Sequence, residues 1–535
     1  MRANALNAAA HCSNDDGAQR PAPAPASAAT TAGVGSDGAA AAAAVPCLTG
    51  LPIIRVPLAD ADEVPSALAA IQFAYTGQVE AGGSVREVLE LYRQGQYLQV
   101  DGCSAACVAA LEEMLAAAPS AGVGSGADSG SGVGGDSGGF TTQPCPTALE
   151  LYGYLRLWPD DPALEPAFAS VLSAARARLV AHFGNALTAL NTLELREQLL
   201  ALPAEGLEAL LESDDFGTDV EDTVLLLLAT WVQENGDTAG AEAVERLCRR
   251  VRLAQLSPEF AALVLPLLAS ARIARPKRSI GSGGPGWFPI TGTEAAFMLS
   301  GFLAGGSTPK RRRLQDAAVK VHGLQAGLFD TKRRRQCLAA SGGDGAAPPG
   351  SPGQQQRQQP QCPAFGWSIS QAELERGLRG LQPGSTVSFA CTLDSGLGAV
   401  SVRGFEWWAS VDYKYGDEAA GLFLWCHLPA AYHLGASSLG GPLAALAQIG
   451  ARWEVDRWRD GVRAVASAVE YNGSDFFGIG ACSGLGVSDM LPLQRGGGCG
   501  GGTAAGGGGA SLAAWSEYLH GGRITGRAVL RPLDV

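Results

Sequence analysis

The sequence has little of what catalytic and metal-binding sites are usually built from. It contains 6 histidines in 535 residues, and His433 and His520 lack the companions of a metal-ligand set. Its 12 cysteines include no Cys-x-x-Cys pair. Acid–base catalysis and metal binding both depend on clusters of such side chains. We therefore expect no catalytic residue, no metal site, no cofactor and no enzymatic activity.

Two local patterns could suggest chemistry, and neither fits. Cys426 and His427 are adjacent in an expected strand, so their side chains point to opposite faces and cannot form a nucleophile–base pair. The segment GIGACSGLG at residues 478–486 has the glycines of a nucleotide loop. It is not preceded by a buried parallel strand and not followed by a helix, as a dinucleotide site requires. The sequence GxxxxGK[ST] does not occur, so nucleotide binding is not expected.

Long apolar runs are also missing. The two longest, which end at Val232 and Ala271, fall short of the ~20 residues that a spanning helix needs. Arg2 is soon followed by Asp15 and Asp16 without a long apolar core between them, so a secretory signal is not expected. The net charge of −13 disfavours bulk attraction to nucleic acid or to an anionic membrane. The scattered cysteines suit reduced thiols in the cytosol or nucleus.

Glycine, in contrast, is abundant and predicts several linkers. The chain has 72 glycines together with runs of Ala, Ser and Gln. Segments so poor in large apolar residues cannot offset their ordering entropy with a core. The expected divisions are a disordered stretch at 1–50, a folded part at 51–118, a Gly/Ser linker at 119–145, a helical domain at 146–275, a disordered linker at 276–363 and a β-domain at 364–535 with a glycine-rich insertion at 495–510.

The first folded part is predicted to be a short strand followed by three helices. Ile54 and Val56 alternate with polar residues, as a half-buried strand requires. Ala67, Leu68, Ile71, Phe73 and Tyr75 are expected to give the next segment one apolar face, and Gly77 should end that helix because it tolerates left-handed angles. In this order FAYTGQVE and QGQYLQV resemble the C-terminal half of a BTB/POZ domain, an α/β protein-interaction module. We expect the N-terminal half of that module, which carries its dimerising helix, to be absent from residues 1–50.

The BTB resemblance implies a site at Tyr97 and Leu98, where such adaptors present a helix end to a cullin. The alternative is packing, with Leu98 in the core and Tyr97 half-exposed. A BTB-mediated dimer would require the complete domain. Cys103 and Cys107 lie one helical turn apart, and helix packing explains them better than metal binding because no second ligand pair follows.

Residues 146–275 predict an all-helical domain, because apolar residues recur at three- and four-residue spacing. Asp219 is placed to cap the longest helix, with Glu221 and Asp222 in its first turn. The stretches LLESDDFGTDVEDTVLLLLATWVQ and AVERLCRRVRLAQLSPEF resemble a BACK domain, which follows BTB in many ubiquitin-ligase adaptors. Trp231 is expected in the core of this domain.

Two basic clusters lie in the expected linker at 276–363. They consist of Lys310, Arg311, Arg312 and Arg313, and of Lys332, Arg333, Arg334 and Arg335. Consecutive cations repel one another and are not expected in a core. We expect a bipartite nuclear-import signal, and hence a nuclear protein; the alternatives are a solvating charge run and a cytoplasmic location. Nucleic-acid binding is less favoured because no aromatic residues for base stacking are interleaved.

In residues 364–535 the apolar residues recur at every second position, which predicts an antiparallel β-sandwich. Apolar residues alternate from Val387 to Cys391, from Phe405 to Tyr413 and beyond Leu422. The order of RGFEWWASVDYKYGDEAAGLFLWCHL and DFFGIGACSGLGVSDML resembles a TRAF/MATH-type sandwich. A domain of this kind that follows a BTB domain and a BACK domain resembles the arrangement in the plant light-response BTB group.

Together these features predict an α+β multidomain protein with a partial BTB domain, a helical BACK domain and a C-terminal β-sandwich. The resemblance implies an adaptor that recruits protein substrates to a cullin-RING ubiquitin ligase of the cullin-3 type. The sandwich would select the client and the BTB part would contact the cullin. The alternative is a non-catalytic scaffold or transcription-associated interaction protein without a ligase role.

Overall fold

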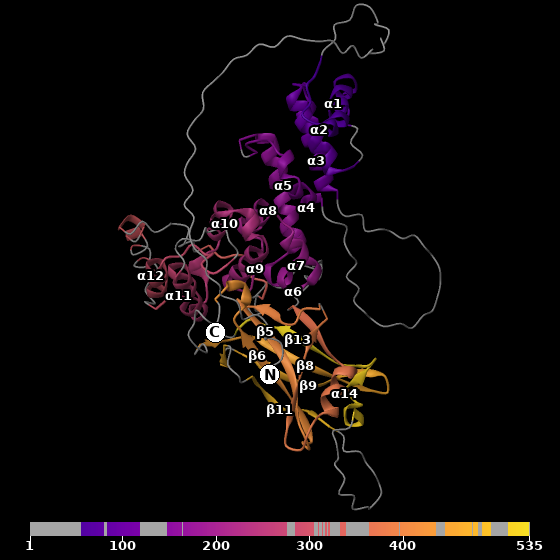
Figure 1. Ribbon diagram of the computed structural model, residues 1–535, viewed down its shortest axis with the longest axis vertical. Helices are drawn as coiled ribbons and strands as arrows, with labels where there is room; N and C mark the ends of the chain where they lie inside the picture. Colours follow the sequence, from indigo (N-terminus) through magenta and orange to yellow (C-terminus); the bar gives the residue numbers. More distant parts are fainter. Residues whose placement is uncertain are drawn as a thin grey trace, which may run out of the picture. The chain divides into compact units, whose positions relative to one another are not determined.

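The computed structural model describes residues 55–79, 83–117, 147–162, 164–274, 284–303, 309, 313, 316–317, 319–321, 332–338, 363–394, 396–434, 445–472, 474–479, 484–493 and 512–533. The predictions made for residues 1–50, 119–145 and 495–510, and for Lys310, Arg311 and Arg312, lie outside these described residues. Helices fill the N-terminal half and antiparallel sheets the C-terminal half (Figure 1), which confirms the α+β multidomain prediction.

Three helices form the first described part: α1 (Val64–Thr76), α2 (Val85–Tyr97) and α3 (Cys103–Ala116). As predicted, α1 ends at Gly77, whose φ is 66° and whose N–H donates to the carbonyl of Phe73. The predicted strand is wrong for its described residues, because residues 55–58 have no regular structure and Val56 is exposed. A strand needs a neighbouring strand for its hydrogen bonds, and none of the described residues supplies one there.

Cys103 and Cys107 pack between helices, as the sequence predicts. Both are buried free thiols on α3. Gly95 allows α2 to approach, since a Cβ at that position would lie 2.6 Å from Sγ of Cys103. Burial raises the pKa of both thiols, so both remain protonated at neutral pH.

The helical domain is built around α9. Its helices are α4 (Thr147–Gly153), α5 (Pro166–Phe183), α6 (Ala186–Asn191), α7 (Leu193–Leu200), α8 (Ala204–Glu212), α9 (Glu221–Ala239), α10 (Ala241–Cys248) and α11 (Pro258–Ala274), with the short 3-10 turn η2 (Leu155–Leu157) after α4. Every residue of α9 from Glu221 to Val232 is buried, including Trp231. A helix buried on all sides is the centre of a bundle, so Trp231 is a core residue as predicted.

Part of the expected linker at 276–363 is folded onto this domain. Helix α12 (Gly292–Leu303) packs against α11, and the turn before it buries Trp287, Phe288 and Ile290. Arg272 of α11 donates to the carbonyl of Gly286 over 3.2 Å. The linker prediction is therefore wrong for residues 284–303, where three large apolar side chains follow one another closely enough to cover a helix.

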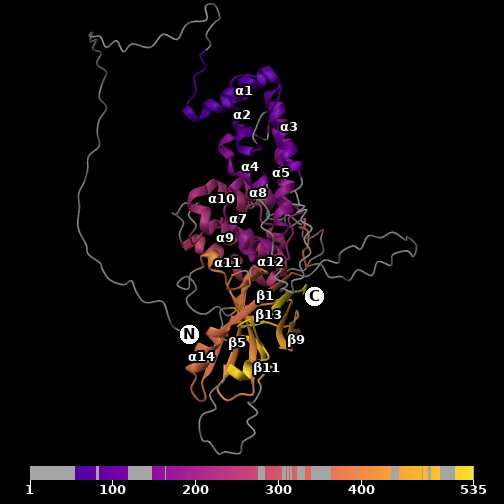
Figure 2. The ribbon, with the colours of Figure 1, turned by 90° about the vertical axis from the view of Figure 1, so that its right-hand side faces the viewer.

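The C-terminal part consists of two larger antiparallel sheets. The first has the order β3–β1–β13–β8–β9 and the second the order β11–β6–β5–β2. The strands are β1 (Ala364–Ser370), β2 (Thr386–Ala390), β3 (Thr392–Leu393), β4 (Val400–Val402), β5 (Phe405–Lys414), β6 (Ala419–His427), β7 (Leu446–Ala447), β8 (Ala451–Arg459), β9 (Val462–Tyr471), β10 (Phe477–Gly478), β11 (Leu485–Pro492), β12 (Leu519–His520) and β13 (Arg523–Leu530). Figure 2 shows strands of both sheets, among them β1, β13, β5 and β11, gathered in one region.

Aromatic side chains also pack a turn against the second sheet, with Trp515 in the 3-10 turn Leu512–Trp515. The buried ring of Trp515 lies 6.3 Å from that of Phe389 on β2 and 5.8 Å from that of Tyr413 on β5. On β6, Cys426 is buried and His427 is exposed, so their side chains do point to opposite faces. Strand β11, and not the helix that a nucleotide loop would require, begins at Leu485, within residues 478–486.

Candidate protein-interaction surfaces

Helix α1 carries an exposed apolar stripe. Val64, Leu68, Ile71 and Tyr75 are spaced by three or four residues, so they share one face of the helix. All four are exposed, Leu68 by 60% and Tyr75 by 88%. The single apolar face expected from the sequence is thus split, because Ala67 and Phe73 are buried while Leu68, Ile71 and Tyr75 are not. A row of exposed large apolar side chains is typical of an interaction site.

Tyr97 and Leu98 have different surroundings at the end of α2. Tyr97 is the last residue of the helix and is 54% exposed. Leu98 is the C-cap, donates its N–H to the carbonyl of Gln94 over 2.9 Å and packs partly against the core. Tyr97 is therefore accessible to a partner, whereas Leu98 serves mainly to pack the helix end.

The second basic cluster is docked on the helical domain. The side chains of Arg334 and Glu221 are 0% and 2% exposed, and Nε of Arg334 lies 3.0 Å from Oε2 of Glu221. The same guanidinium donates to the carbonyls of Ser213, over 2.9 Å, and Arg250, over 3.2 Å. The prediction that these cations have no core role is wrong for Arg334, because a buried carboxylate compensates its charge.

Backbone hydrogen bonds hold the same segment, residues 332–337, which we call the strap. The backbone N–H of Arg335 donates to the carbonyl of Asp214 over 2.8 Å, and the backbone carbonyl of Arg335 accepts from the N–H of Thr218 over 2.9 Å. Cys337 donates to the carbonyl of Thr218 over 3.0 Å, which completes a short parallel bridge. Hydrogen bonds from Lys332, and then from Arg252, lower the pKa of the Asp214 carboxyl. The strap is thus attached as an added strand with charged anchors.

The loop before α9 also contacts the β-domain. Oδ2 of Asp219 accepts the backbone N–H of Arg403 over 3.0 Å. The N-cap of α9 is Val220, without a side-chain hydrogen bond, so the prediction that Asp219 caps this helix is wrong. Nearby, the amide of Asn191 is hydrogen-bonded to both the N–H and the carbonyl of Ser401, each over 2.7 Å. The side chains of Asp219 and Asn191 thus form hydrogen bonds with backbone groups of Ser401 and Arg403.

Asp222 is a buried carboxyl at the same junction. It accepts the N–H of Ser257 over 2.8 Å and the hydroxyl of Ser257 over 2.5 Å. Burial raises its pKa to about 7, although Arg403 and Ser257 lower it in part. A Cβ placed at Gly404 would lie 2.9 Å from Cβ of Asp222, so the β4–β5 turn packs directly on this group.

The raised pKa of Asp222 predicts a pH-dependent stability. In the unfolded chain the carboxyl has the ordinary aspartate pKa of 3.8, whereas in the folded chain its pKa of about 7 keeps it protonated at lower pH. The native state therefore binds the extra proton, and the free energy of unfolding should fall as pH rises from about 4 to 7. Asp222→Asn is neutral throughout and should lack this decline. Urea unfolding of both proteins across this range measures the difference, and parallel pH profiles would contradict the assignment.

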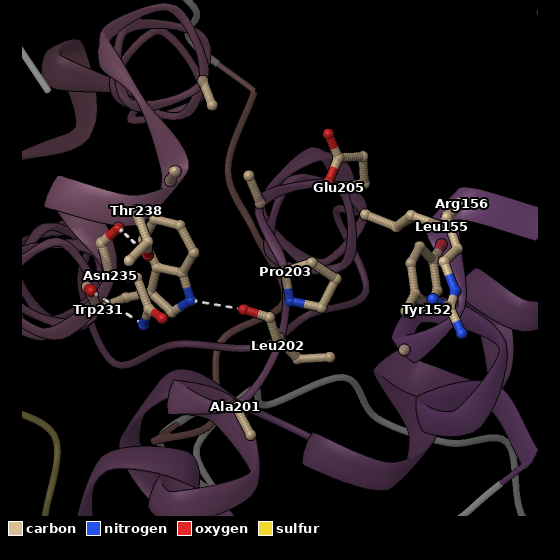
Figure 3. Close-up of a pocket in the computed structure, with 14 residues that line it drawn as sticks. Tyr152, Leu155, Arg156, Ala201, Leu202, Pro203, Glu205, Trp231, Asn235 and Thr238 are labelled. Atoms are coloured by element: carbon tan, nitrogen blue, oxygen red, sulfur yellow. Dashed lines mark hydrogen bonds between the residues drawn. The ribbon is translucent and has the colours of Figure 1, made fainter. Parts of the chain in front are cut away.

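A pocket of about 490 Å³ opens on the helical domain between η2, the α7–α8 junction and α9. Figure 3 shows the indole N–H of Trp231 donating a hydrogen bond to the carbonyl of Leu202. On the same helix, the side chain of Asn235 donates to the carbonyl of Trp231, and the hydroxyl of Thr238 donates to the carbonyl of Asn235. Asn235 also donates to the carbonyl of Leu200 over 2.9 Å. The side chains of Trp231 and Asn235 thus join α9 to the chain around α7, whereas the hydroxyl of Thr238 donates within α9. Burial raises the pKa of Tyr152 in the wall to about 12, so its phenol stays protonated at neutral pH.

The described residues contain no group of three or more His, Cys, Asp or Glu side chains arranged to hold a metal ion. No described helix is both long and apolar enough to cross a membrane.

Comparison with known families supports the helical domain. Residues 168–265 match the BACK family model, described as "BTB And C-terminal Kelch". No curated protein and no solved structure matches the chain significantly. The matched residues begin within α5 and end within α11, so they cover most of the expected domain. BACK domains are typical of BTB adaptor proteins, which supports an adaptor role in general terms.

Proposed function

We propose that this chain is an adaptor that recruits protein substrates to a cullin-RING ubiquitin ligase of the cullin-3 type. The observation that carries the proposal is the BACK match over residues 168–265, on a helical domain built around the buried helix α9. We further propose that residues 55–117 are the C-terminal half of a BTB domain and that the two-sheet domain is of the TRAF/MATH type, as in the plant light-response BTB group. Ubiquitin transfer would then belong to other subunits.

The exposed stripe of α1 supports the BTB part of this proposal. Leu68, Ile71 and Tyr75 leave apolar surface in water, which is unfavourable unless another protein segment covers it. The N-terminal half of a BTB domain would be such a segment. Cullin contact would then be shared between that half and the helix end at Tyr97, which is accessible.

The β-domain offers an edge for client binding. Strand β9 is last in the order of its sheet and β11 is first in the order of the other. Val462 and Val465 on β9, and Leu485 and Val487 on β11, are exposed apolar residues. Edge strands with apolar side chains bind extended peptides by strand addition. We propose that clients dock there.

The ligase role predicts that cullin binding depends on a complete BTB domain. A stable protein interface usually requires more than ~1,000 Å², which a half-domain is not expected to supply. The 535-residue chain should bind a cullin weakly, whereas a version extended to a full BTB domain should bind it. Tyr97→Ala should weaken the extended complex at least about tenfold, because aromatic anchors dominate such contacts.

Phe476→Ala is the matched control for this pull-down, since Phe476 is also 54% exposed but lies in the β-domain. It should leave cullin binding unchanged. Tight binding by the short chain would show that the interface lies elsewhere. Absence of binding by the extended chain would favour a scaffold without a ligase role.

We also propose that the protein acts in the nucleus, with the two basic clusters as its import signal. Of the first cluster, only Arg313 is among the described residues, and its side chain is exposed to solvent. The second cluster is part of the strap and is docked on the helical domain, so a receptor can reach it only when the strap is released.

A further inference from the structure

The helical-domain residues that contact the strap, which we call the groove, fit an extended arginine-containing segment. Its floor carries the buried carboxylate of Glu221, and the carbonyls of Ser213 and Arg250 point at the same guanidinium. Its rim carries Asp214, and Thr218 offers a backbone N–H and carbonyl for strand pairing. The groove therefore recognises both the charge and the backbone of the segment that fills it.

The cations that an import receptor must reach are engaged in this groove. Arg334 is buried and makes four hydrogen bonds. Arg335 donates to the carbonyl of Gly184 over 2.7 Å, and Lys332 pairs with Asp214. Arg333 is exposed, and no described residue contacts it through a hydrogen bond or ion pair. A receptor cannot bind the cluster as an extended basic peptide while the strap stays docked.

We propose that the acidic groove of the helical domain withholds the second basic cluster from import receptors, and that release of the strap controls nuclear import. The inference rests on the proposed import role. Release of the strap leaves the buried carboxylate of Glu221 without its cation, which is unfavourable. We therefore expect the strap to be released in only a small fraction of molecules, on the order of one in a hundred to one in a thousand. The apparent affinity of a receptor for the docked chain falls by the same factor.

Glu221→Gln in the full chain is the direct test. It removes the carboxylate charge that pairs with Arg334 and leaves every cation to which a receptor would bind. Binding to a purified import receptor that recognises bipartite basic clusters should tighten on the order of a hundredfold. Glu242→Gln makes the same charge change at an exposed position of α10 and should have no effect. Adding Arg333→Ala to Glu221→Gln should reverse the gain, which shows that it acts through this cluster.

A second readout separates strap release from unfolding of the domain. Trypsin cleavage after residues 332–335, compared with cleavage after the exposed Arg313, should be slow in the original chain and fast in Glu221→Gln. Cys337→Pro removes the N–H that donates to Thr218 while leaving all charges and the helical core in place. It should increase both cleavage and receptor binding, with the helical circular dichroism unchanged.

Two results would overturn the proposal. Cleavage of the original chain at residues 332–335 as fast as at Arg313 would show that the strap is not docked. Faster cleavage in both variants with unchanged receptor affinity would show that docking does not mask the cluster. The import role fails separately if a tagged chain keeps its distribution when the first cluster, Arg333 and Arg335 are changed to Ala. That outcome would remove the control of import while leaving the docking result in place.

Discussion

Replacing Trp231 with Ala should lower the free energy of unfolding by about 3–5 kcal/mol, the usual cost of deleting a buried Trp. The side chain is 1% exposed at the centre of the helical domain, and its indole N–H donates to the carbonyl of Leu202 over 2.9 Å. It also lines the pocket at the α7–α8 junction, so its removal would enlarge a space that already exists.

Urea unfolding followed by far-ultraviolet circular dichroism measures this loss, since α9 and its neighbours dominate the signal. Trp231→Phe is the graded control, because it retains most of the apolar volume and gives up the indole hydrogen bond. Its cost should be clearly smaller. A loss below about 1 kcal/mol for Trp231→Ala would contradict a core role.

Arg334→Met should also destabilise the helical domain by about 3–5 kcal/mol, because it leaves the buried Glu221 carboxylate without its cation. Glu221 is fixed in the first turn of α9 and cannot move into solvent. Its remaining hydrogen bond, from the N–H of Arg252 over 2.9 Å, does not neutralise the charge. The same urea experiment measures the effect.

The double variant Arg334→Met, Glu221→Gln should regain most of this stability, because no buried charge remains. Glu221→Gln alone should cost less than Arg334→Met, since Arg334 lies on the strap and can move into water. Arg333→Met is the matched control on an exposed neighbour and should change stability by less than about 0.5 kcal/mol. Equal losses from Arg333→Met and Arg334→Met would contradict the buried pair.

Much of the fold could be predicted because it depends on local periodicity. Apolar residues at helical spacing predicted α2, α3 and the bundle around α9, and Gly77 was placed correctly at the end of α1. Two-residue alternation predicted β5 and β6 and the opposite directions of Cys426 and His427. The expected strand near Val56 failed because a strand also needs a partner, which alternation cannot show.

The candidate sites were only partly predictable. Tyr97 is 54% exposed at a helix end, which fits both the expected cullin contact and the alternative of half-exposed packing. The face that α1 buries was misassigned, because its sequence is apolar on more than one side and only the packing of Ala67 and Phe73 selects the inner side. Asp219 was expected to cap α9, yet it binds the backbone of Arg403, 184 residues away. A cap is a local pattern, whereas this contact requires the two domains to meet.

The sequence by itself thus determined most of the secondary structure, the division into helical and β parts and the BACK resemblance, since these follow from the spacing of side chains along the chain. Only the tertiary structure decided the state of the second basic cluster. Arg334 and Glu221 are 113 residues apart, and nothing in four consecutive cations indicates that one of them is buried. A charge enters a protein interior only where an opposite charge and hydrogen-bond partners are already positioned, and folding alone brings those groups together.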